Sequence, residues 1–547
     1  MKTKIGTFSI ALILILIAAP FSEVYAQGNH IKQEMRGVWV ATTKNIDYPS
    51  SAFLTVEQQK AEFIDMLNLF ESLNINAVML QVRPAADAFF PSRYEPWSEW
   101  LTGVQGKAPN PYYDPLKFMI KECRKRGIEF HAWVNPFRAV ANIETADVTA
   151  DHVSNRRPDW VFTYGINKYF NPGIPEVRHY INNVVCDIVR RYDVDGIHFD
   201  DYFYPYPTKD ENRKFISVPD YDTYIKYGKD FDNIDNWRRN NLNVFIRSMN
   251  DSIKAIRADI KFGIAPSGVW RNKSRDPKGS DTRGFAHYDY LYADVLTWLK
   301  NEWIDYVAPQ LYWSIGHKYA DYQTLVDWWS KNCYNRHLYI GHGVYMADTN
   351  AADKNWRNPS QLPEQMRINK RTKKVSGSIF YKASALQRNA MGFNDSLKTH
   401  FYASYSKTPE MPWLLTAADT TAVIPPDVTI TDTVLHIDTQ APPAPVSLSS
   451  IPFGRKLILS WTAPNTSGEN FDDKPDYYKV YRFEGKEAEE ISPLYFTEFR
   501  TKLFYSIPKK WFAIFRKHYT YVVTSVDKAG NESEPSKPIH LKFKLRK

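Results

Sequence analysis

A pair of adjacent carboxylates at the end of a short apolar run is the feature of this sequence best suited to chemistry. His198 and Asp200 alternate with Ile197 and Phe199, so a β-strand would place the two polar side chains together on one face. Asp201 begins the following loop and can turn toward the same cavity. Asp200 and Asp201 are therefore the first candidates for acid and base catalysis, with loop capping or an ion pair as the alternative.

Polar and aromatic side chains also end other predicted strands, on the face that alternation assigns to the interior. Amides, histidines and arginines in such places either hydrogen-bond one another or bind a substrate rich in hydroxyl groups. Their recurrence with aromatic residues between them favours a sugar-binding cleft over a self-satisfied polar core. The candidate substrate-binding residues are Gln81, Arg83, Trp97, His131, Trp133, Asn135, Arg138, His198, Tyr202, Gln310, Tyr312 and Trp313.

Other chemistries have weaker support in the sequence. His131, His198, Asp200 and His342 could assemble a metal site, but no H-x-H or H-E-x-x-H pattern is present. The sequence has no G-x-S-x-G elbow, which argues against a serine hydrolase, and no Walker or dinucleotide-binding loop. We therefore expect neither a metal ion nor a cofactor.

The elements that must position these residues alternate between short β-like runs and amphipathic helical runs. Eight strands separated by helices over some 370 residues predict a (β/α)8 barrel with long loops after the strands, where catalytic groups of such barrels lie. A doubly wound open sheet is the alternative, but it would need a glycine-rich phosphate loop after its first strand. The predicted strands are residues 36–42, 77–83, 129–135, 196–200, 261–266, 306–312, 338–343 and 377–381.

Composition narrows the class of protein. The 547 residues are 43% hydrophobic and 15% aromatic, which supports a large core and excludes disorder. Three cysteines cannot form a disulfide framework, and a buried apolar role is expected for each. The net charge of +9 is spread over 70 basic and 61 acidic residues, so no nucleic-acid partner is predicted.

The N-terminus resembles a secretory signal peptide. Lys2 and Lys4 precede an uncharged apolar run that ends before Pro20, and Ala26 closes a small-residue cleavage pattern. The run is short for a bilayer span, although an uncleaved anchor is the alternative. We expect residues 1–26 to be removed and the protein to be exported to the periplasm, the cell surface or the medium, without lasting membrane insertion.

The sequence changes character after residue 402. Residues 33–402 form the predicted barrel, and residues 403–441 are rich in Thr, Pro and Asp, which predicts an extended linker. From Pro442 to the end, short alternating strands predict a small β-sandwich of the immunoglobulin-like class. Several of its residues resemble a fibronectin type III domain, namely Pro442-Pro443, Leu459 to Trp461, Tyr481, Tyr521 and Ala529 to Ser533.

The barrel resembles a known family. The matching segments are MRGVW at 35–39, QVRP at 81–84 with Asp87, PWS at 96–98 with LTG at 101–103, DPL at 114–116, RG at 126–127 with HAWVNPFR at 131–138, and DGIHFDDY at 195–202. Together they are similar to glycosyl-hydrolase-like family ten, formerly a domain of unknown function. The resemblance covers about residues 33–400. It implies a (β/α)8 glycosidase acting on a polysaccharide, and members of the family include an enzyme that cleaves peptidoglycan glycan strands lacking stem peptides.

The mechanism implied by this resemblance needs two acids across a glycosidic bond, or one acid beside a substrate N-acetyl group. Asp200 and Asp201 are the expected essential carboxylates, with the choice of general acid open, and Asp87 is the expected distant partner. Gln310 stands where many retaining barrel enzymes carry an acid, which weakens a double-displacement mechanism. Substrate assistance stays open, as does a non-catalytic carbohydrate-binding or envelope-scaffold protein.

Overall fold

The computed structural model describes residues 33–415 as one continuous stretch and most of the strands that follow. In the C-terminal part it describes residues 441–453, 456–464, 475, 477–485, 496–500, 504–508, 517–526 and 532–543. The predicted signal peptide and residues 416–440 of the predicted linker lie outside the described residues. Two compact units are present.

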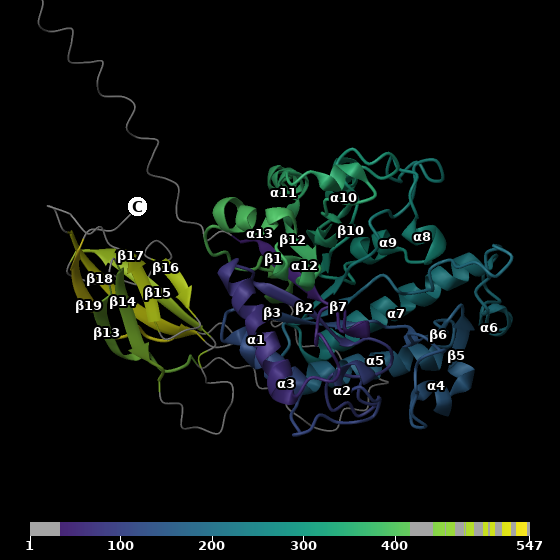
Figure 1. Cartoon of the computed structure of the whole chain (residues 1–547), viewed down its shortest axis with the longest axis horizontal. Helices are drawn as coiled ribbons and strands as arrows, with labels where there is room; N and C mark the ends of the chain where they lie inside the picture. Colours follow the sequence, from purple (N-terminus) through teal and green to yellow (C-terminus); the bar gives the residue numbers. More distant parts are fainter. Residues whose placement is uncertain are drawn as a thin grey trace, which may run out of the picture. The chain divides into compact units, whose positions relative to one another are not determined.

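Residues 33–415 form a closed ring of eight parallel strands, which confirms the predicted (β/α)8 barrel (Figure 1). The ring closes where the last strand pairs with the first, with Met35 beside Gly377. The sixth strand is divided by Ala308 and Pro309, since proline has no N–H to give to a ladder. The strands are β1 (Met35–Val40), β2 (Ala77–Arg83), β3 (Glu129–Val134), β7 (Gly196–Phe199), β8 (Lys261–Ile264), β9 (Tyr306–Val307) with β10 (Gln310–Leu311), β11 (His337–Gly343) and β12 (Val375–Tyr381).

Helices follow each strand and cover the outside of the ring. The Asp114 side chain caps α3 by accepting from the Lys117 N–H, and Pro115 takes the first turn, as the sequence predicts. The helices are α1 (Val56–Ser72), α2 (Glu99–Thr102), α3 (Pro115–Arg124), α4 (Val153–Arg156), α5 (Pro175–Arg191), α6 (Tyr221–Tyr227), α7 (Ile234–Ile256), α8 (His287–Tyr290), α9 (Val295–Lys300), α10 (Tyr322–Asn332), α11 (Gln361–Arg371), α12 (Ala383–Gln387), α13 (Phe393–Ser396) and α14 (Pro412–Leu415). Among the helices that the structure describes, none is long and apolar enough to cross a bilayer.

Alternation along the strands separates two buried clusters. Outward side chains such as Val38, Leu80 and Phe199 pack against the helices. The side chains that face inward form a second cluster, to which Trp39, Met79, Trp133, Tyr306, Tyr339 and Ile379 belong. The inward faces expected for β2, β3 and the sixth strand are therefore the observed ones.

Glycines leave room for large rings inside the barrel. A Cβ on Gly263 would lie 2.0 Å from the ring of Tyr306, and a Cβ on Gly196 would lie 2.5 Å from His131 Nδ1. Neither position tolerates a side chain unless a ring moves. These two glycines therefore allow a buried layer of polar rings beneath the mouth of the barrel.

The N-terminal end of the barrel is closed by residues that the composition assigned to the linker. Met411 and Leu414 pack into the inner cluster, and Trp413 Nε1 donates to Asp305 at 2.8 Å. The Thr408 hydroxyl donates to Glu129 on the inward face of β3. The packed unit thus continues past residue 402, because apolar side chains of this Pro-rich segment fill the N-terminal end of the barrel as a plug.

A small antiparallel sheet, absent from the sequence prediction, lies in the long loop after β3. It consists of β4 (Arg138–Val140), β5 (Val161–Tyr164) and β6 (Asn167–Phe170). Its strands have three or four residues, too few to show a period of two in the sequence. The sheet carries Arg138 and Tyr169 toward the ends of the barrel strands.

The second unit consists of antiparallel strands, which confirms the small all-β unit after the barrel (Figure 1). In its described part, β14 pairs with β13 and β17, while β15 and β18 pair centrally between β16 and β19. Leu459 and Trp461 of one sheet share a core with Val480 and Tyr521 of the other. The strands are β13 (Val446–Phe453), β14 (Lys456–Thr462), β15 (Tyr477–Glu484), β16 (Phe496–Arg500), β17 (Phe504–Pro508), β18 (Lys517–Val526) and β19 (Ile539–Phe543). The fibronectin type III resemblance stays a prediction.

Candidate active site

Asp200 and Asp201 lie where β7 ends, at the C-terminal mouth of the barrel, and are 5% and 4% exposed. Asp200 Oδ2 accepts hydrogen bonds from Trp133 Nε1 and Asn135 Nδ2, both at 3.1 Å. Its other oxygen accepts from the backbone N–H of Tyr202 at 3.3 Å. Trp133 and Asn135 of the neighbouring strand therefore position this carboxyl group.

Asp201 has a different set of partners. The Tyr206 hydroxyl donates a hydrogen bond to Asp201 Oδ2, and the side-chain amide of Gln310 lies near enough to lower the pKa of this carboxyl group. Gln310 is held in turn by a bond from its Nε2 to the Ala265 carbonyl at 2.9 Å. Gln310 stands on the sixth strand where many retaining barrel enzymes carry an acid, and here it lies beside the carboxyl group of Asp201.

Burial alters the pKa of both carboxyl groups. It raises the pKa of Asp200 to about 7, and the adjacent charge of Asp201 adds to this, while the Arg138 guanidinium and the Trp133 bond oppose it. Burial also raises the pKa of Asp201, against the lowering effect of the Tyr206 and Gln310 bonds. Burial therefore raises the pKa of both groups, and that of Asp200 reaches about 7, so near neutral pH Asp200 is placed to hold a proton that it can give to a substrate.

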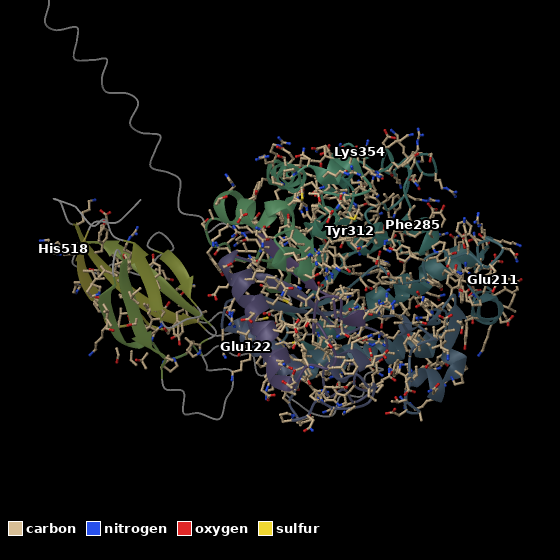
Figure 2. The ribbon with its side chains drawn as sticks, viewed as in Figure 1. Glu122, Glu211, Phe285, Tyr312, Lys354 and His518 are labelled. Carbon is tan, nitrogen blue, oxygen red and sulfur yellow. The ribbon has the colours of Figure 1, made fainter. Side chains whose placement is uncertain are left out.

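Aromatic side chains lie at the mouth, among them Tyr312, which is labelled in Figure 2. Tyr312 and Tyr381 stack with their ring centres 5.7 Å apart, and Tyr345, 40% exposed, meets Tyr381 edge-on. The Arg138 guanidinium lies 4.2 Å from the centre of the Tyr202 ring. Flat rings and a cation of this kind suit the faces and substituents of sugars.

Trp313 lies next to this group and packs tightly. Its ring approaches the backbone at Gly268, where a Cβ would lie 2.7 Å from it, and its carbonyl accepts from Gln365 Nε2 at 3.1 Å. Trp97, on the loop after β2, meets Tyr112 edge-on at 6.4 Å. Trp97 therefore lies in a separate aromatic contact of the second loop.

His131 and His198 do not reach the mouth, contrary to the expectation that they bind substrate. Both are fully buried beneath it in one chain of hydrogen bonds. Trp39 Nε1 donates to His198 Nε2 at 2.9 Å, and the Tyr306 hydroxyl lies 2.9 Å from a ring nitrogen of each histidine. His131 Nε2 faces Glu129 at 3.2 Å. Burial lowers the pKa of both histidines, so two neutral rings complete a polar layer inside the barrel.

Arg83 and Gln81 are also occupied by protein groups. Arg83 forms a fully buried ion pair with Glu95, with Nη2 2.6 Å from Oε1, and donates to the Asn135 and Pro136 carbonyls. Gln81 Oε1 accepts from the backbone N–H groups of residues 42 and 43 at 3.1 and 3.0 Å. Both side chains hold loops in place, so the expectation of substrate contact is not met.

Asp87 lies in the loop after β2, apart from the Asp200–Asp201 pair. Its Oδ1 accepts from the Ala85 N–H at 3.0 Å, and its side chain also bonds Ser98. Burial raises the pKa of Asp87 to about 7, and the neighbouring charges that add to this are those of Glu95 and Glu99. The bond from Ala85 lies within the second loop, and the role of Asp87 as distant catalytic partner stays a prediction.

The groups considered for metal binding are not gathered. His342 points to the outer side of the barrel wall, where its ring nitrogens face Gln365 and Ser378 at 3.0 and 3.1 Å. Within the described residues, no cluster of three or more His, Cys, Asp or Glu side chains is placed to hold an ion.

Sequence reasoning missed three tyrosines of the site. Tyr381 ends β12 on its inward face, so the alternation rule could have found it. Tyr206 follows Asp201 by five residues within a Tyr-rich loop, but nothing local shows that it donates to Asp201. Tyr345 lies beyond the end of β11, in a short helical turn that no pattern predicted.

Comparison with known proteins agrees with this geometry. The family described as Glycosyl hydrolase-like 10 matches residues 34–358. The chain belongs to this family. Glycosyl hydrolase YngK of Bacillus subtilis (strain 168) is 41% identical over 543 residues, which are 98% of each chain. Glycosyl hydrolase DigH of Escherichia coli (strain K12) is 38% identical over 381 residues, 65% of this chain and 84% of the relative.

Among solved structures, the glycoside hydrolase domain of PgaB from Bordetella bronchiseptica covers 67% of this chain and 99% of its own. Its sequence identity is 14% and its TM-score is 0.43. The endo-beta-1,4-mannanase of Thermotoga petrophila covers 95% of this chain at 9% identity, with a TM-score of 0.38.

Proposed function

We propose that this member of the family is an exported glycoside hydrolase that cleaves peptidoglycan glycan strands lacking stem peptides. The observation that carries the proposal is the buried pair Asp200–Asp201 at the mouth of the barrel. Two adjacent buried carboxyl groups are costly to the fold, since each disfavours the charge of the other. A protein that only binds glycan would use the surrounding rings and amides and would gain nothing from this pair.

In the proposed reaction Asp200 is the general acid. The proton that its raised pKa retains near neutral pH goes to the glycosidic oxygen as the bond to the sugar breaks. Asp201 is the ionised partner in this proposal: the Tyr206 hydroxyl donates to it and stabilises its charge, and it faces the positive charge that develops on the sugar. In one route a water molecule attacks the sugar carbon, Asp201 takes the water proton, and the anomeric configuration inverts. In the other route the oxygen of the substrate N-acetyl group attacks and forms an oxazolinium ion, and water then opens this ion while Asp200 takes the water proton, so the configuration is retained. The anomeric form of the product distinguishes the two routes.

Arg138 supports the choice of substrate. It is half-buried beside the carboxylate pair and has no ion pair in the described part of the chain. Removing the stem peptide from a muramic acid leaves a free lactyl carboxylate, whereas the attached peptide converts this group to a neutral amide. A guanidinium without a partner at the mouth favours the free carboxylate. The proposal also requires export, because peptidoglycan lies outside the cytoplasm. The predicted signal peptide at residues 1–26 supports this.

Digestion of purified peptidoglycan tests this function. Wild-type protein is incubated with intact and with amidase-treated peptidoglycan, and soluble glycan products are followed by chromatography. We expect products from the amidase-treated material, and none from the intact material. The hydrolase proposal fails if no glycan yields products. Equal yields from both materials would remove the preference for strands without peptides.

A Tyr206→Phe variant tests the roles of the two carboxylates. The hydroxyl stabilises the ionised form of Asp201, so its loss raises the pKa of Asp201. A hydrogen bond to a charged group contributes about 1.5–3 kcal/mol, so the acidic limb of kcat/KM against pH should move up by about one to two pH units. Tyr202→Phe is the control, because Tyr202 bonds Asp200 through its backbone N–H. An unchanged limb in Tyr206→Phe would show that Asp201 is not the ionised partner.

A further inference from the structure

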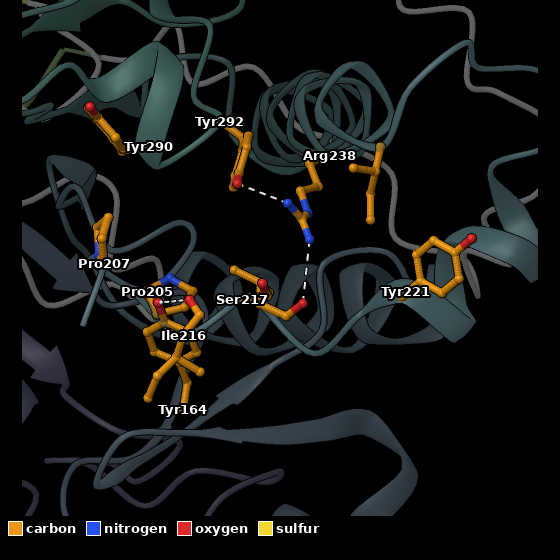
Figure 3. Close-up of a pocket in the computed structure, with 11 residues that line it drawn as sticks. Tyr164, Pro205, Pro207, Ile216, Ser217, Tyr221, Arg238, Tyr290 and Tyr292 are labelled. Carbon is orange, nitrogen blue, oxygen red and sulfur yellow. Dashed lines mark hydrogen bonds between the residues drawn. The ribbon is translucent and has the colours of Figure 1, made fainter. Parts of the chain in front are cut away.

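A pocket of about 340 Å³ lies between the long loop after β7 and helices α6 and α7. Tyr164 of β5, Ser217 of the loop, Tyr221 of α6 and Tyr290 of α8 line it (Figure 3). Tyr221 and Tyr290 are 62% and 41% exposed and stand on opposite sides of the view. Pockets for small ligands begin at about 300 Å³, so this one suits a single small unit.

The pocket shares a wall with the mouth of the barrel. Pro205 and Pro207 line the pocket, and Tyr206 between them donates to Asp201. The Tyr206 ring stacks on Phe285 with centres 4.9 Å apart, and Phe285 stacks on Tyr290 at 5.0 Å. A continuous row of three rings therefore leads from the carboxylate pair to the edge of the pocket.

The charge in the pocket is already neutralised. Arg238 forms an ion pair with the buried Asp220, its Nε lying 2.9 Å from a carboxylate oxygen, and donates to the Tyr292 hydroxyl at 2.8 Å. A further bond from Arg238 Nη2 reaches the Val218 carbonyl at 3.5 Å. Since the cation is occupied, a free anion gains little here, and the pocket suits an uncharged ligand.

The remaining lining combines apolar and hydroxyl groups. Ile216, Val218 and Ile234 present aliphatic surface, while Ser217 and the exposed tyrosines present hydroxyl groups. Aliphatic surface takes the C–H face of a sugar and the methyl of an acetamido group, and the hydroxyl groups take its polar atoms. We propose that this pocket is a distal subsite for a neutral N-acetylated sugar unit of the same glycan chain that crosses Asp200 and Asp201. The inference rests on the proposed function, since the glycan chain that is cleaved at Asp200 and Asp201 would extend into this pocket.

Binding of N-acetylglucosamine oligosaccharides of increasing length tests the subsite, measured by calorimetry on full-length protein. Asp200→Asn is the common background, so that no probe is cleaved. Into it we introduce Tyr290→Ala, which removes an exposed ring, and Ser217→Trp, which fills the pocket. Tyr334→Ala is the matched control: Tyr334 is 42% exposed and precedes β11 at the opposite end of the barrel.

We expect Tyr290→Ala to weaken the binding of long oligosaccharides by about 3- to 10-fold, the loss of one aromatic contact. Ser217→Trp should weaken it at least as much, because the indole ring occupies the space of the sugar unit. Oligosaccharides too short to reach the pocket should bind as they do to the background variant, and Tyr334→Ala should change neither. The subsite is wrong if long chains bind equally to all variants, if short chains lose as much as long ones, or if no oligosaccharide binds. Failure of the hydrolase proposal is a separate result, since cleavage is scored only with wild-type protein.

Discussion

An Asp200→Asn variant is expected to lose about 10²- to 10⁴-fold in kcat on peptidoglycan glycan, with KM within a few-fold of wild type. The asparagine oxygen can take the place of Oδ2 and keep the bonds from Trp133 Nε1 and Asn135 Nδ2, while its NH2 group replaces Oδ1 and loses the bond from the Tyr202 N–H. Most of the contacts that shape the mouth are therefore kept. It has no proton of suitable acidity to give to the leaving oxygen. Steady-state rates on amidase-treated glycan measure the loss, and a kcat within a few-fold of wild type would remove Asp200 from the reaction.

The same variant should be more stable than wild type at alkaline pH. Burial raises the pKa of Asp200 from 3.8 to about 7, so the folded state binds this proton more tightly than the unfolded state. The wild-type free energy of unfolding therefore falls as pH rises from about 4 through about 7. A pKa raised from 3.8 to about 7 corresponds to a loss of at most about 4 kcal/mol of wild-type unfolding free energy, complete above about pH 7. Denaturant unfolding at pH 4 and pH 8 should show a gain for Asp200→Asn only at pH 8.

Asp87→Asn is the matched control for both effects. Burial raises the pKa of Asp87 to about 7 as well, so this variant should gain stability at pH 8 in the same way. Its carboxyl group bonds only to its own loop, through Ala85 and Ser98, so kcat should stay near wild type. A large loss of kcat in Asp87→Asn would instead support the role of distant catalytic partner that the sequence suggested.

The barrel could be predicted because its strands are buried on both faces and are separated by helices of regular period. Apolar alternation located all eight strands and correctly assigned the inward faces of β2, β3 and β7. The division of the sixth strand depends on Pro309, and the plug formed by Met411 and Leu414 depends on packing across the barrel end. Neither leaves a local pattern in the sequence.

Only part of the site could be predicted from the sequence. Alternation shows which face of a strand a side chain occupies, but not how far below the mouth of the barrel it lies. His198 and Asp200 share a face, but two residues correspond to roughly 6–7 Å along the strand. His198 therefore lies in the buried polar layer with Tyr306, while Asp200 lies at the mouth. The same step separates His131 from Trp133 on β3. The position of a residue relative to the strand end decides its role.

Arg83 and Arg138 were predicted to have the same role, and the structure gives them different ones. Arg83 ends β2, and Arg138 follows the end of β3. Glu95 lies twelve residues beyond Arg83, in the loop after β2, and forms an ion pair with it. No spacing rule connects an arginine at a strand end to a glutamate in an irregular loop. Arg138 reaches the mouth because the small sheet β4–β6–β5 carries it there.

An Arg83→Met variant is therefore expected to lose about 3–5 kcal/mol of unfolding free energy. It leaves the Glu95 carboxylate buried without its partner and removes the donors to the Asn135 and Pro136 carbonyls. Asn135 in turn donates to Asp200, so Arg83 acts on the site by holding the end of β3. The double variant Arg83→Met with Glu95→Met should recover much of the loss, because both charges are then absent. Denaturant unfolding measures each step.

Arg138→Met is the matched control, since Arg138 lies over Tyr202 without an ion pair in the described residues. We expect its unfolding free energy to change by less than about 1 kcal/mol, because no ion pair is broken, and its KM for peptide-free glycan to rise. Folded Arg83→Met should keep the wild-type KM. The assignment is reversed if Arg83→Met keeps full stability and raises KM, because that pattern belongs to a residue that contacts the substrate rather than one that holds the strand beneath it.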